Sequence, residues 1–206
     1  HQYVPHRRDP HPGRPPGKPV IYLNNAATTL QKPPCVVQAV VDAMNGQGSC
    51  GRGSHTSELS AARSLFHARE SLARLFAFHY PERVVFTANA TQALNAALWG
   101  LLNPGDHVIA TDWDHNSVLR PLHALEKERG VKMDYLSADL QGRLEYDRLE
   151  GLLRPSTKLL VGTHASNLTG NLLDVRRMSA FAQKHGLVFL LDAAQTAGST
   201  PIDMEE

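Results

Sequence analysis

A regular alternation of short apolar runs with amphipathic stretches, between residues 84 and 191, most restricts how this chain can fold. The apolar runs have the length of strands, and the stretches between them carry apolar residues at helical spacing. The alternation predicts strands at 84–86, 107–111, 132–137, 158–163 and 187–191, and helices at 92–102, 117–128, 146–153 and 175–185. Strands that alternate with helices form a mainly parallel sheet covered on both faces, so we expect a three-layer α/β fold.

The chain before residue 84 predicts further elements of this kind. They are a strand at 20–23 and helices at 35–44 and 57–76. Between the two helices, residues 46–53 hold four glycines around Arg52. This segment, with His55, is either a lid at the rim of a substrate site or a plain flexible connection. A chain of 206 residues with 42% hydrophobic composition can bury the core of one large domain, or of a domain and a fragment.

Residues 1–19 differ in composition from the rest of the chain. They contain six prolines and are basic, with a single acidic residue, Asp9. Such a composition cannot bury enough apolar surface to fold, so we expect a disordered, proline-rich leader. Residues 20–206 are expected to form the folded domain.

Charge and composition argue against several classes of partner. The formal net charge of +1 provides no strong field for nucleic acid or an anionic membrane surface. No run reaches the roughly 18 apolar residues that span a bilayer, so we expect a cytoplasmic protein. Cys35 and Cys50 are too few for a disulfide framework. No cysteine–histidine cluster has zinc spacing, so no metal is expected.

The stretch from Val84 to Leu102 predicts a strand, a loop of small residues and a helix. Such a unit leaves backbone N–H groups unpaired at the helix N-terminus, where the macrodipole adds partial positive charge. A phosphate group can bind there. Asn89 is the natural N-cap, and Thr91 adds a hydroxyl donor. The alternative interpretation is an ordinary capped helix that binds nothing.

Polar residues follow the other predicted strands at the edge where parallel sheets bind ligands. The segments after the strands are Thr87–Thr91, Asp114–Ser117, Ser166–Asn167 and Asp192–Gln195. A phosphate site, an imidazole, an amide and a carboxylate on one edge indicate a flat, anionic, heteroaromatic ligand. Taken singly, each has an ordinary structural interpretation: His115 as a surface residue in a turn, Asn167 as a turn former and Asp192 as a helix N-cap.

Asp192 is the most informative of these residues, because it follows a continuous apolar strand. An unpaired charge there would cost several kcal/mol, so the carboxylate needs a cationic partner. The protonated pyridine nitrogen of pyridoxal 5'-phosphate (PLP) is such a partner, and His115 could stack on its ring. Asn167 and Gln195 could bond the phenolic oxygen. The glycine motifs of dinucleotide and P-loop sites and the G-x-S-x-G elbow of α/β-hydrolases are absent from the sequence.

Several stretches of the chain occur in family order and carry a resemblance to one enzyme family. They are YLNNAATT at 22–29, GRGSHTSE at 51–58, VVFTANATQALN at 84–95, PGDHVIATDWDHNSVLRPL at 104–122, HASNLTGNLLDV at 164–175 and VFLLDAAQTAG at 188–198. The sequence resembles the class V aminotransferase family of fold type I PLP enzymes. Within this family it is most similar to the cysteine desulfurase and selenocysteine lyase group.

The resemblance implies a role for each matching residue. The implied cofactor-binding residues are Ala90, Thr91, His115, Asn167, Asp192 and Gln195. Ala90 and Thr91 would hold the phosphate, and Asn167 and Gln195 would contact the ring hydroxyl. His115, stacked on the ring, and Asp192, paired with the ring nitrogen, would be the catalytic residues. The implied substrate-side residues are Ala26, Ala27 and His55.

The chain departs from the family pattern in three ways. Asn89 stands where relatives often have glycine, and Asn116 where a second histidine is common. Relatives place their Schiff-base lysine in a Ser/Thr-Gly-His-Lys segment beyond the position of Asp192, and the sequence ends at Glu206 without it. The small C-terminal domain, the arginine for the substrate carboxylate and the acceptor cysteine are also missing. Residues 20–206 are therefore expected to form an incomplete PLP-binding large domain.

Two classes of function remain open at this point. The first is a PLP-dependent enzyme that removes sulfur or selenium from L-cysteine or L-selenocysteine to give alanine, with its remainder in a further segment or chain. Within this class, transamination or β-elimination is the alternative reaction. The second is a non-catalytic subunit that binds the cofactor or a partner. The resemblance also implies a homodimer and a possible sulfur-acceptor protein.

Overall fold

The computed structural model describes residues 21–23, 25, 28–49 and 55–205. The predicted leader at 1–19 therefore lies outside the described residues. The chain divides into two compact units, residues 1–45 and 46–206. No helix in the described ranges is long and apolar enough to cross a membrane.

The first unit contains most of helix α1, Pro34–Gly46, which confirms the helix predicted at 35–44. Proline is favourable at the first position of a helix because it lacks only an N–H group that would be unpaired there. The strand predicted at 20–23 is wrong for its three described residues, 21–23, which adopt no strand.

The second unit begins with α2, Thr56–Leu75, close to the helix predicted at 57–76. The strand predicted at 84–86 is wrong: a short 3-10 helix, η1 (Pro81–Arg83), is followed by unpaired chain. Val84 has extended backbone angles, φ −76° and ψ 118°. However, Val85 is 76% exposed and no described strand pairs with the segment. An extended segment becomes a strand only when a neighbour satisfies its backbone groups.

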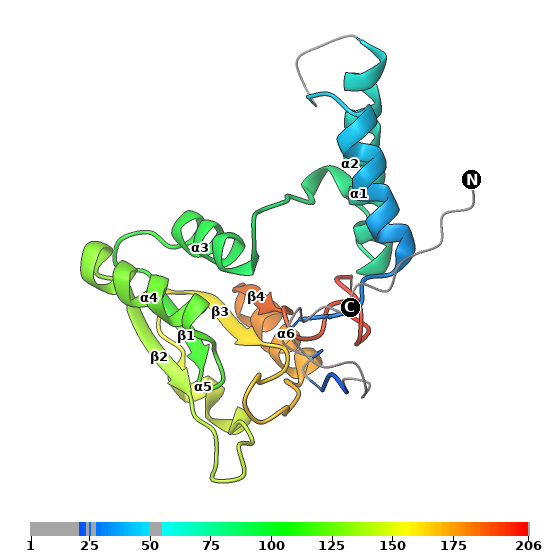
Figure 1. The fold of residues 1–206 in the computed structure, drawn as a ribbon. Helices are drawn as coiled ribbons and strands as arrows, with labels where there is room; N and C mark the ends of the chain where they lie inside the picture. Colours follow the sequence, from blue (N-terminus) through cyan, green and yellow to red (C-terminus); the bar gives the residue numbers. More distant parts are fainter. Residues whose placement is uncertain (1–20, 24, 26–27, 50–54, 206) are drawn as a thin grey trace. The chain divides into compact units, whose positions relative to one another are not determined.

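The other four predicted strands form one parallel sheet, which confirms the expected fold class (Figure 1). They are β1 (His107–Thr111), β2 (Lys132–Leu136), β3 (Thr157–Thr163) and β4 (Val188–Asp192). Their order is β2-β1-β3-β4. In the register of the last pair, Thr163 lies beside Asp192. The carboxyl ends of β3 and β4 therefore bring these two polar residues together.

One helix precedes the first strand, and helices lie in each of the crossovers between the parallel strands. They are α3 (Ala90–Leu101), α4 (Asn116–Arg129), α5 (Leu149–Leu152) and α6 (Val175–His185). The helix predicted at 146–153 is shorter than expected, a 3-10 turn, η2 (Tyr146–Arg148), followed by one turn of α5. Gly151 lowers helix propensity there, and Pro155 prevents the helix from continuing. The helix at 175–185 has the predicted bounds.

Two apolar clusters cover the two faces of the sheet. On β1, Val108 and Ala110 join one cluster and Ile109 joins the other, because successive side chains point to opposite faces. The first cluster includes Leu94, Leu98 and Leu102 with Val118, Leu122 and Leu125, from the region of α3 and from α4. The second includes Met178, Phe181 and Ala182 from α6. Packing on both faces of the sheet therefore fixes the positions of the carboxyl ends of the strands relative to one another.

Candidate functional site

The carboxyl edge of the sheet holds a cavity of about 260 Å³. All six residues predicted to bind a cofactor line it: Ala90, Thr91, His115, Asn167, Asp192 and Gln195. The remaining lining residues are Asn89, Leu94, Ser117, Thr163 and Ala194. Residues from the ends of three strands and the loops after them meet the N-terminal part of α3 at one site. Parallel strands place their following loops on the same edge.

The N-terminus of α3 forms one wall of the cavity. Asn89 is extended, and its side chain accepts a hydrogen bond of 2.9 Å from the backbone N–H of Gln92. The Gln92 side chain in turn accepts a hydrogen bond of 2.8 Å from the backbone N–H of Ala88. The backbone N–H groups of Ala90 and Thr91 have no partner among the described residues. These two donors, with the positive end of the helix dipole, form a site suited to a phosphate group.

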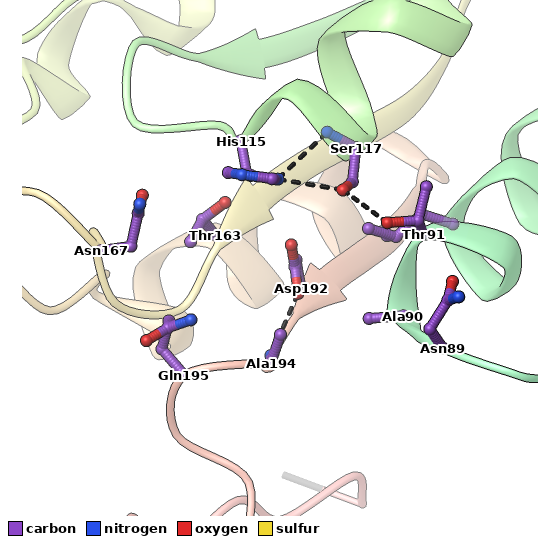
Figure 2. A pocket seen from close by; sticks show the side chains of 11 residues that line it. Asn89, Ala90, Thr91, His115, Ser117, Thr163, Asn167, Asp192, Ala194 and Gln195 are labelled. Carbon is purple, nitrogen blue, oxygen red and sulfur yellow. Dashed lines mark hydrogen bonds between the residues drawn. The ribbon is translucent and has the colours of Figure 1, made fainter. Parts of the chain in front are cut away.

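His115 stands at the N-terminus of α4 and is its N-cap. Its Nδ1 accepts a hydrogen bond of 3.1 Å from the backbone N–H of Ser117. The Ser117 hydroxyl lies 2.9 Å from the same Nδ1 and 2.8 Å from the Thr91 hydroxyl. Figure 2 shows this chain of contacts running from the imidazole to α3. The imidazole is therefore held by the first turn of its own helix and connected to the neighbouring one.

Asp114, the residue before His115, anchors this loop from inside the protein. It is 6% exposed. Its carboxylate accepts hydrogen bonds from the Thr111 backbone N–H at 2.7 Å and the Thr163 hydroxyl at 2.9 Å. Burial raises the pKa of the Asp114 carboxyl to about 6, although these hydrogen bonds oppose the shift. Asp114 thus fixes the start of the loop that carries His115.

Asp192 ends β4 and is 8% exposed. Its Oδ1 accepts a hydrogen bond of 3.0 Å from the Ala194 backbone N–H. Within the described ranges, its second carboxylate oxygen has no hydrogen-bond partner and no cation pairs with it. Figure 2 shows Asp192 between Ala90 on one side and Asn167 and Gln195 on the other. This arrangement leaves a carboxylate oxygen free for a donor in the cavity.

The predictions for the substrate side have a different outcome. Ala26 and Ala27 lie outside the described residues. His55 is exposed at the start of α2, where its backbone N–H donates to Glu58 at 3.3 Å, and it does not line the cavity. Its predicted role at the substrate stays a prediction.

Sequence reasoning assigned no role to Thr163 or Ser117. Thr163 is the last residue of β3 and so lies before the strand-end positions from which the site is predicted. A polar residue at the last position of an otherwise apolar strand is the sequence feature that could indicate a site residue such as Thr163. Ser117 belongs to the polar segment predicted after β1, but only the structure shows that its hydroxyl contacts two other residues of the site.

No lysine lines the cavity in the part of the chain that the structure describes. Lys184, on α6, instead pairs with Glu150 at 2.5 Å. The described lining residues therefore offer anion donors, an imidazole, three side-chain amides and a carboxylate, but no amine.

Comparison with known proteins agrees with this geometry. The family model described as aminotransferase class-V matches residues 21–206, which is most of the chain. The chain belongs to the aminotransferase class-V family. Because this match covers both the sheet and the cavity, the resemblance inferred from the sequence motifs is confirmed.

Members of the family that share this sequence pattern include cysteine desulfurases. A probable cysteine desulfurase from Halalkalibacterium halodurans is 32% identical over 195 residues, covering 92% of this chain and 48% of that protein. A cysteine desulfurase from Haloferax volcanii is 34% identical over 194 residues, covering 91% and 45%. The chain thus spans about half the length of the curated relatives it matches.

Solved structures of the family show the same fold. The apo cysteine desulfurase from Thermococcus onnurineus matches with a TM-score of 0.83 and 29% identity, over 90% of this chain and 47% of that one. Cysteine desulfurase CsdA from Escherichia coli matches with a TM-score of 0.74 and 29% identity, over 87% and 46%. The parallel sheet and its covering helices are therefore those of a fold type I member of the family.

Proposed function

We propose that this chain binds PLP and forms the cofactor-binding part of a cysteine desulfurase. The observation that carries the proposal is the buried carboxylate of Asp192. One of its oxygens lacks a partner among the described residues, and it shares a cavity with an imidazole and the N-terminus of a helix. A buried carboxylate without a cation is costly, so the cavity is suited to a ligand that carries a cationic, hydrogen-bonding group.

The residues present fit PLP group by group. The free N–H groups at Ala90 and Thr91 would hold the phosphate, and Asp192 would accept a hydrogen bond from the protonated ring nitrogen. His115 would cover the ring, while Asn167 and Gln195 would contact its phenolic oxygen. Bound PLP supplies an electron sink for reactions at the Cα atom of an amino acid.

Each side chain then has a physical task in the proposed reaction. Asp192 keeps the ring nitrogen protonated, because a carboxylate stabilises a positive charge in a poorly solvated site. His115 lines the cavity, and because its Nδ1 is bound to Ser117, its Nε2 is the nitrogen that can hold or move a proton there. The backbone donors of α3 fix the anionic end of the ligand and so orient its other end.

The proposed substrate is L-cysteine or a related amino acid such as L-selenocysteine, with alanine as the product. One relative described above is a cysteine desulfurase, another is a probable cysteine desulfurase, and two solved structures are cysteine desulfurases, which supports this choice. The reaction also needs a Schiff-base lysine and an acceptor cysteine, which we assign to a further segment or chain. A cytoplasmic homodimer that delivers sulfur to an acceptor protein completes the proposal.

A second candidate is a PLP-binding subunit without catalysis of its own. One observation favours it: no lysine lines the cavity within the described residues. Transamination or β-elimination would use the same cofactor residues as desulfuration, so the products decide among these reactions.

Titration of the intact protein with PLP, followed by absorbance and fluorescence, tests the binding site. We expect saturable binding that weakens at least tenfold in Asp192→Ala, with a smaller loss in Asp192→Asn, which keeps a polar group but no charge. Equal affinity in the wild type and both variants would refute the assignment of Asp192 to the ring nitrogen.

A product assay tests the reaction. Intact protein supplied with PLP, L-cysteine and a thiol reductant should release sulfide and alanine in equal amounts. Pyruvate with ammonia would instead indicate β-elimination, and a keto acid without sulfide would indicate transamination. PLP binding without any of these products would support the non-catalytic subunit. Borohydride reduction followed by peptide mass spectrometry would locate the lysine that holds the cofactor.

A further inference from the structure

The contacts of His115 reveal which ring nitrogen is available to a ligand. The Ser117 backbone N–H can only donate, and it points to Nδ1 at 3.1 Å. Nδ1 must therefore carry a lone pair and not a proton. In a neutral imidazole, the proton then resides on Nε2.

The Ser117 hydroxyl reinforces this arrangement. It lies 2.9 Å from His115 Nδ1, and because this nitrogen acts as an acceptor, the contact is a hydrogen bond donated by the hydroxyl. The hydroxyl then has no second hydrogen for Thr91, so its 2.8 Å contact with that residue is donated by Thr91. The three groups form a directed chain from Thr91 through Ser117 to His115.

We propose that Ser117 is a positioning residue that holds His115 as the Nε2–H tautomer and directs this N–H group into the cavity. The backbone N–H and the hydroxyl of Ser117 share the single lone pair of Nδ1. The opposite tautomer would set the hydrogen on Nδ1 against the backbone N–H, which cannot accept it, and would reverse the hydroxyl contact. No other side chain in the described ranges forms a hydrogen bond with the His115 ring nitrogens. The tautomer is thus set by a single residue.

The chain of hydroxyls has a second consequence. Thr91 lies at the proposed phosphate site, and Ser117 connects it to the imidazole (Figure 2). A phosphate that accepts the Thr91 hydroxyl hydrogen would free the Ser117 oxygen from its donor while the Ser117 hydroxyl still donates to Nδ1. The orientation of His115 therefore does not depend on whether the phosphate site is filled.

Nitrogen-15 NMR of the histidine rings in cofactor-free, intact protein tests the tautomer directly. The spectrum is recorded at alkaline pH, where imidazoles are neutral, and the His115 signals are assigned by their loss in His115→Gln. We expect one protonated and one unprotonated nitrogen, with the proton on Nε2 alone. A proton on Nδ1, or averaging between the two forms, would overturn the proposal.

Variants at Ser117 test whether this residue sets the tautomer. Ser117→Ala loses the hydroxyl and keeps the N–H, so a measurable fraction of the Nδ1–H form should appear. Ser117→Thr keeps both donors and should match the wild type. Ser179→Ala, a half-buried helical serine away from the cavity, is the matched control. If the spectrum of Ser117→Ala were identical to that of the wild type, the hydroxyl would have no role in setting the tautomer of His115.

The catalytic importance of Ser117 rests on the proposed function, whereas its effect on the tautomer does not. In PLP-loaded enzyme, Ser117→Ala should lower kcat several-fold with little change in KM, and Ser117→Thr should restore it. If the protein fails to bind PLP but the NMR result holds, the proposed function is wrong and the positioning role stands. If PLP binds and the two tautomers are mixed, the positioning role of Ser117 is wrong and the proposed function stands.

Discussion

Thr163 Oγ1 donates a hydrogen bond of 2.9 Å to Asp114 Oδ1, which ties the end of β3 to the loop after β1. Asp114 precedes His115, and Thr163 lies beside Asp192 in the register of β3 and β4. One hydrogen bond between two buried residues thus connects the loop of the proposed ring-stacking residue with the strand next to the proposed ring-nitrogen partner.

Asp114 should make stability depend on pH in an unusual direction. Burial raises the pKa of its carboxyl from 3.8 to about 6, so the folded protein binds a proton more tightly than the unfolded chain does. Its contribution to the free energy of unfolding therefore increases as pH falls from above 6 towards 4, by up to about 3 kcal/mol. Denaturant unfolding across this range should show this gain in the wild type relative to Asp114→Asn. Parallel curves for the two proteins would contradict the assignment.

Removal of the Thr163 hydroxyl should destabilise the fold. In Thr163→Val the side chain keeps its shape, but one oxygen of a buried carboxylate loses its donor, which costs about 1–3 kcal/mol. Thr163→Ser keeps the hydroxyl and should lose less. Thermal unfolding of the wild type and both variants provides the measurement. A melting temperature of Thr163→Val equal to that of the wild type would exclude a role for the hydrogen bond.

Asn89 should contribute to stability as the N-cap of α3. Its side chain accepts a hydrogen bond of 2.9 Å from the Gln92 N–H, and the loss of such a cap costs about 1 kcal/mol. Asn89→Ala should therefore unfold at lower denaturant concentration, whereas Asn89→Ser, which can cap the helix, should stay close to the wild type. Indistinguishable midpoints for both variants would show that the cap carries no stability.

His107 should destabilise the protein as pH falls. It is fully buried at the opposite edge of the sheet, with Nδ1 2.7 Å from the Thr157 hydroxyl and Nε2 3.2 Å from Asp134. Burial, followed by the charge of Arg154, lowers the pKa of His107 below 6.5. The folded protein therefore binds this proton less tightly than the unfolded chain, and stability is lost as pH falls below 6.5.

His107→Gln should flatten this pH dependence relative to the wild type, as measured by chemical denaturation. The exposed His123 on α4 offers a matched control, because its side chain is 61% accessible. His123→Gln should leave the slope unchanged. If stability changed with pH in His107→Gln as steeply as in the wild type, other groups would dominate the pH dependence below 6.5.

His115 should affect the cofactor as well as the rate. His115→Ala removes the imidazole that we place over the PLP ring, so it should lower kcat by about 10²-fold or more and shift the absorbance of bound PLP. Asp192→Asn should weaken PLP binding and also lower kcat, because an amide no longer keeps the ring nitrogen protonated. An unchanged absorbance spectrum in His115→Ala would reduce His115 to a helix cap.

Most of the fold could be predicted from local pattern. The strands at 107–111, 132–137, 158–163 and 187–191 agree with the structure to within one residue at each end. They combine short apolar runs with clear breaks, and each has a neighbour with which to pair. The segment at 84–86 has the same composition but no described neighbour, and pairing cannot be read from composition.

The site residues were predictable as a group because of where they occur. Asp192 and His115 each follow a predicted strand, and parallel strands bring such positions to one edge. Ser117 and Thr163 were not assigned roles, because a serine early in a helix and a threonine that ends a strand are common in any α/β protein. Their importance depends on distances between residues far apart in the chain.

The sequence by itself determined the order of strands and helices, the sheet class and the set of polar residues at the strand ends, since each follows from periodicity along the chain. Only the structure decided that one carboxylate oxygen of Asp192 lacks a partner among the described residues, that Asp114 is bonded to Thr163, and that Ser117 holds Nδ1 of His115. Hydrogen bonds of this kind join residues 2 to 49 positions apart. The longest of them depends on how the strands align in the sheet, which no local pattern encodes, and the short ones depend on the backbone angles that each turn adopts in the fold.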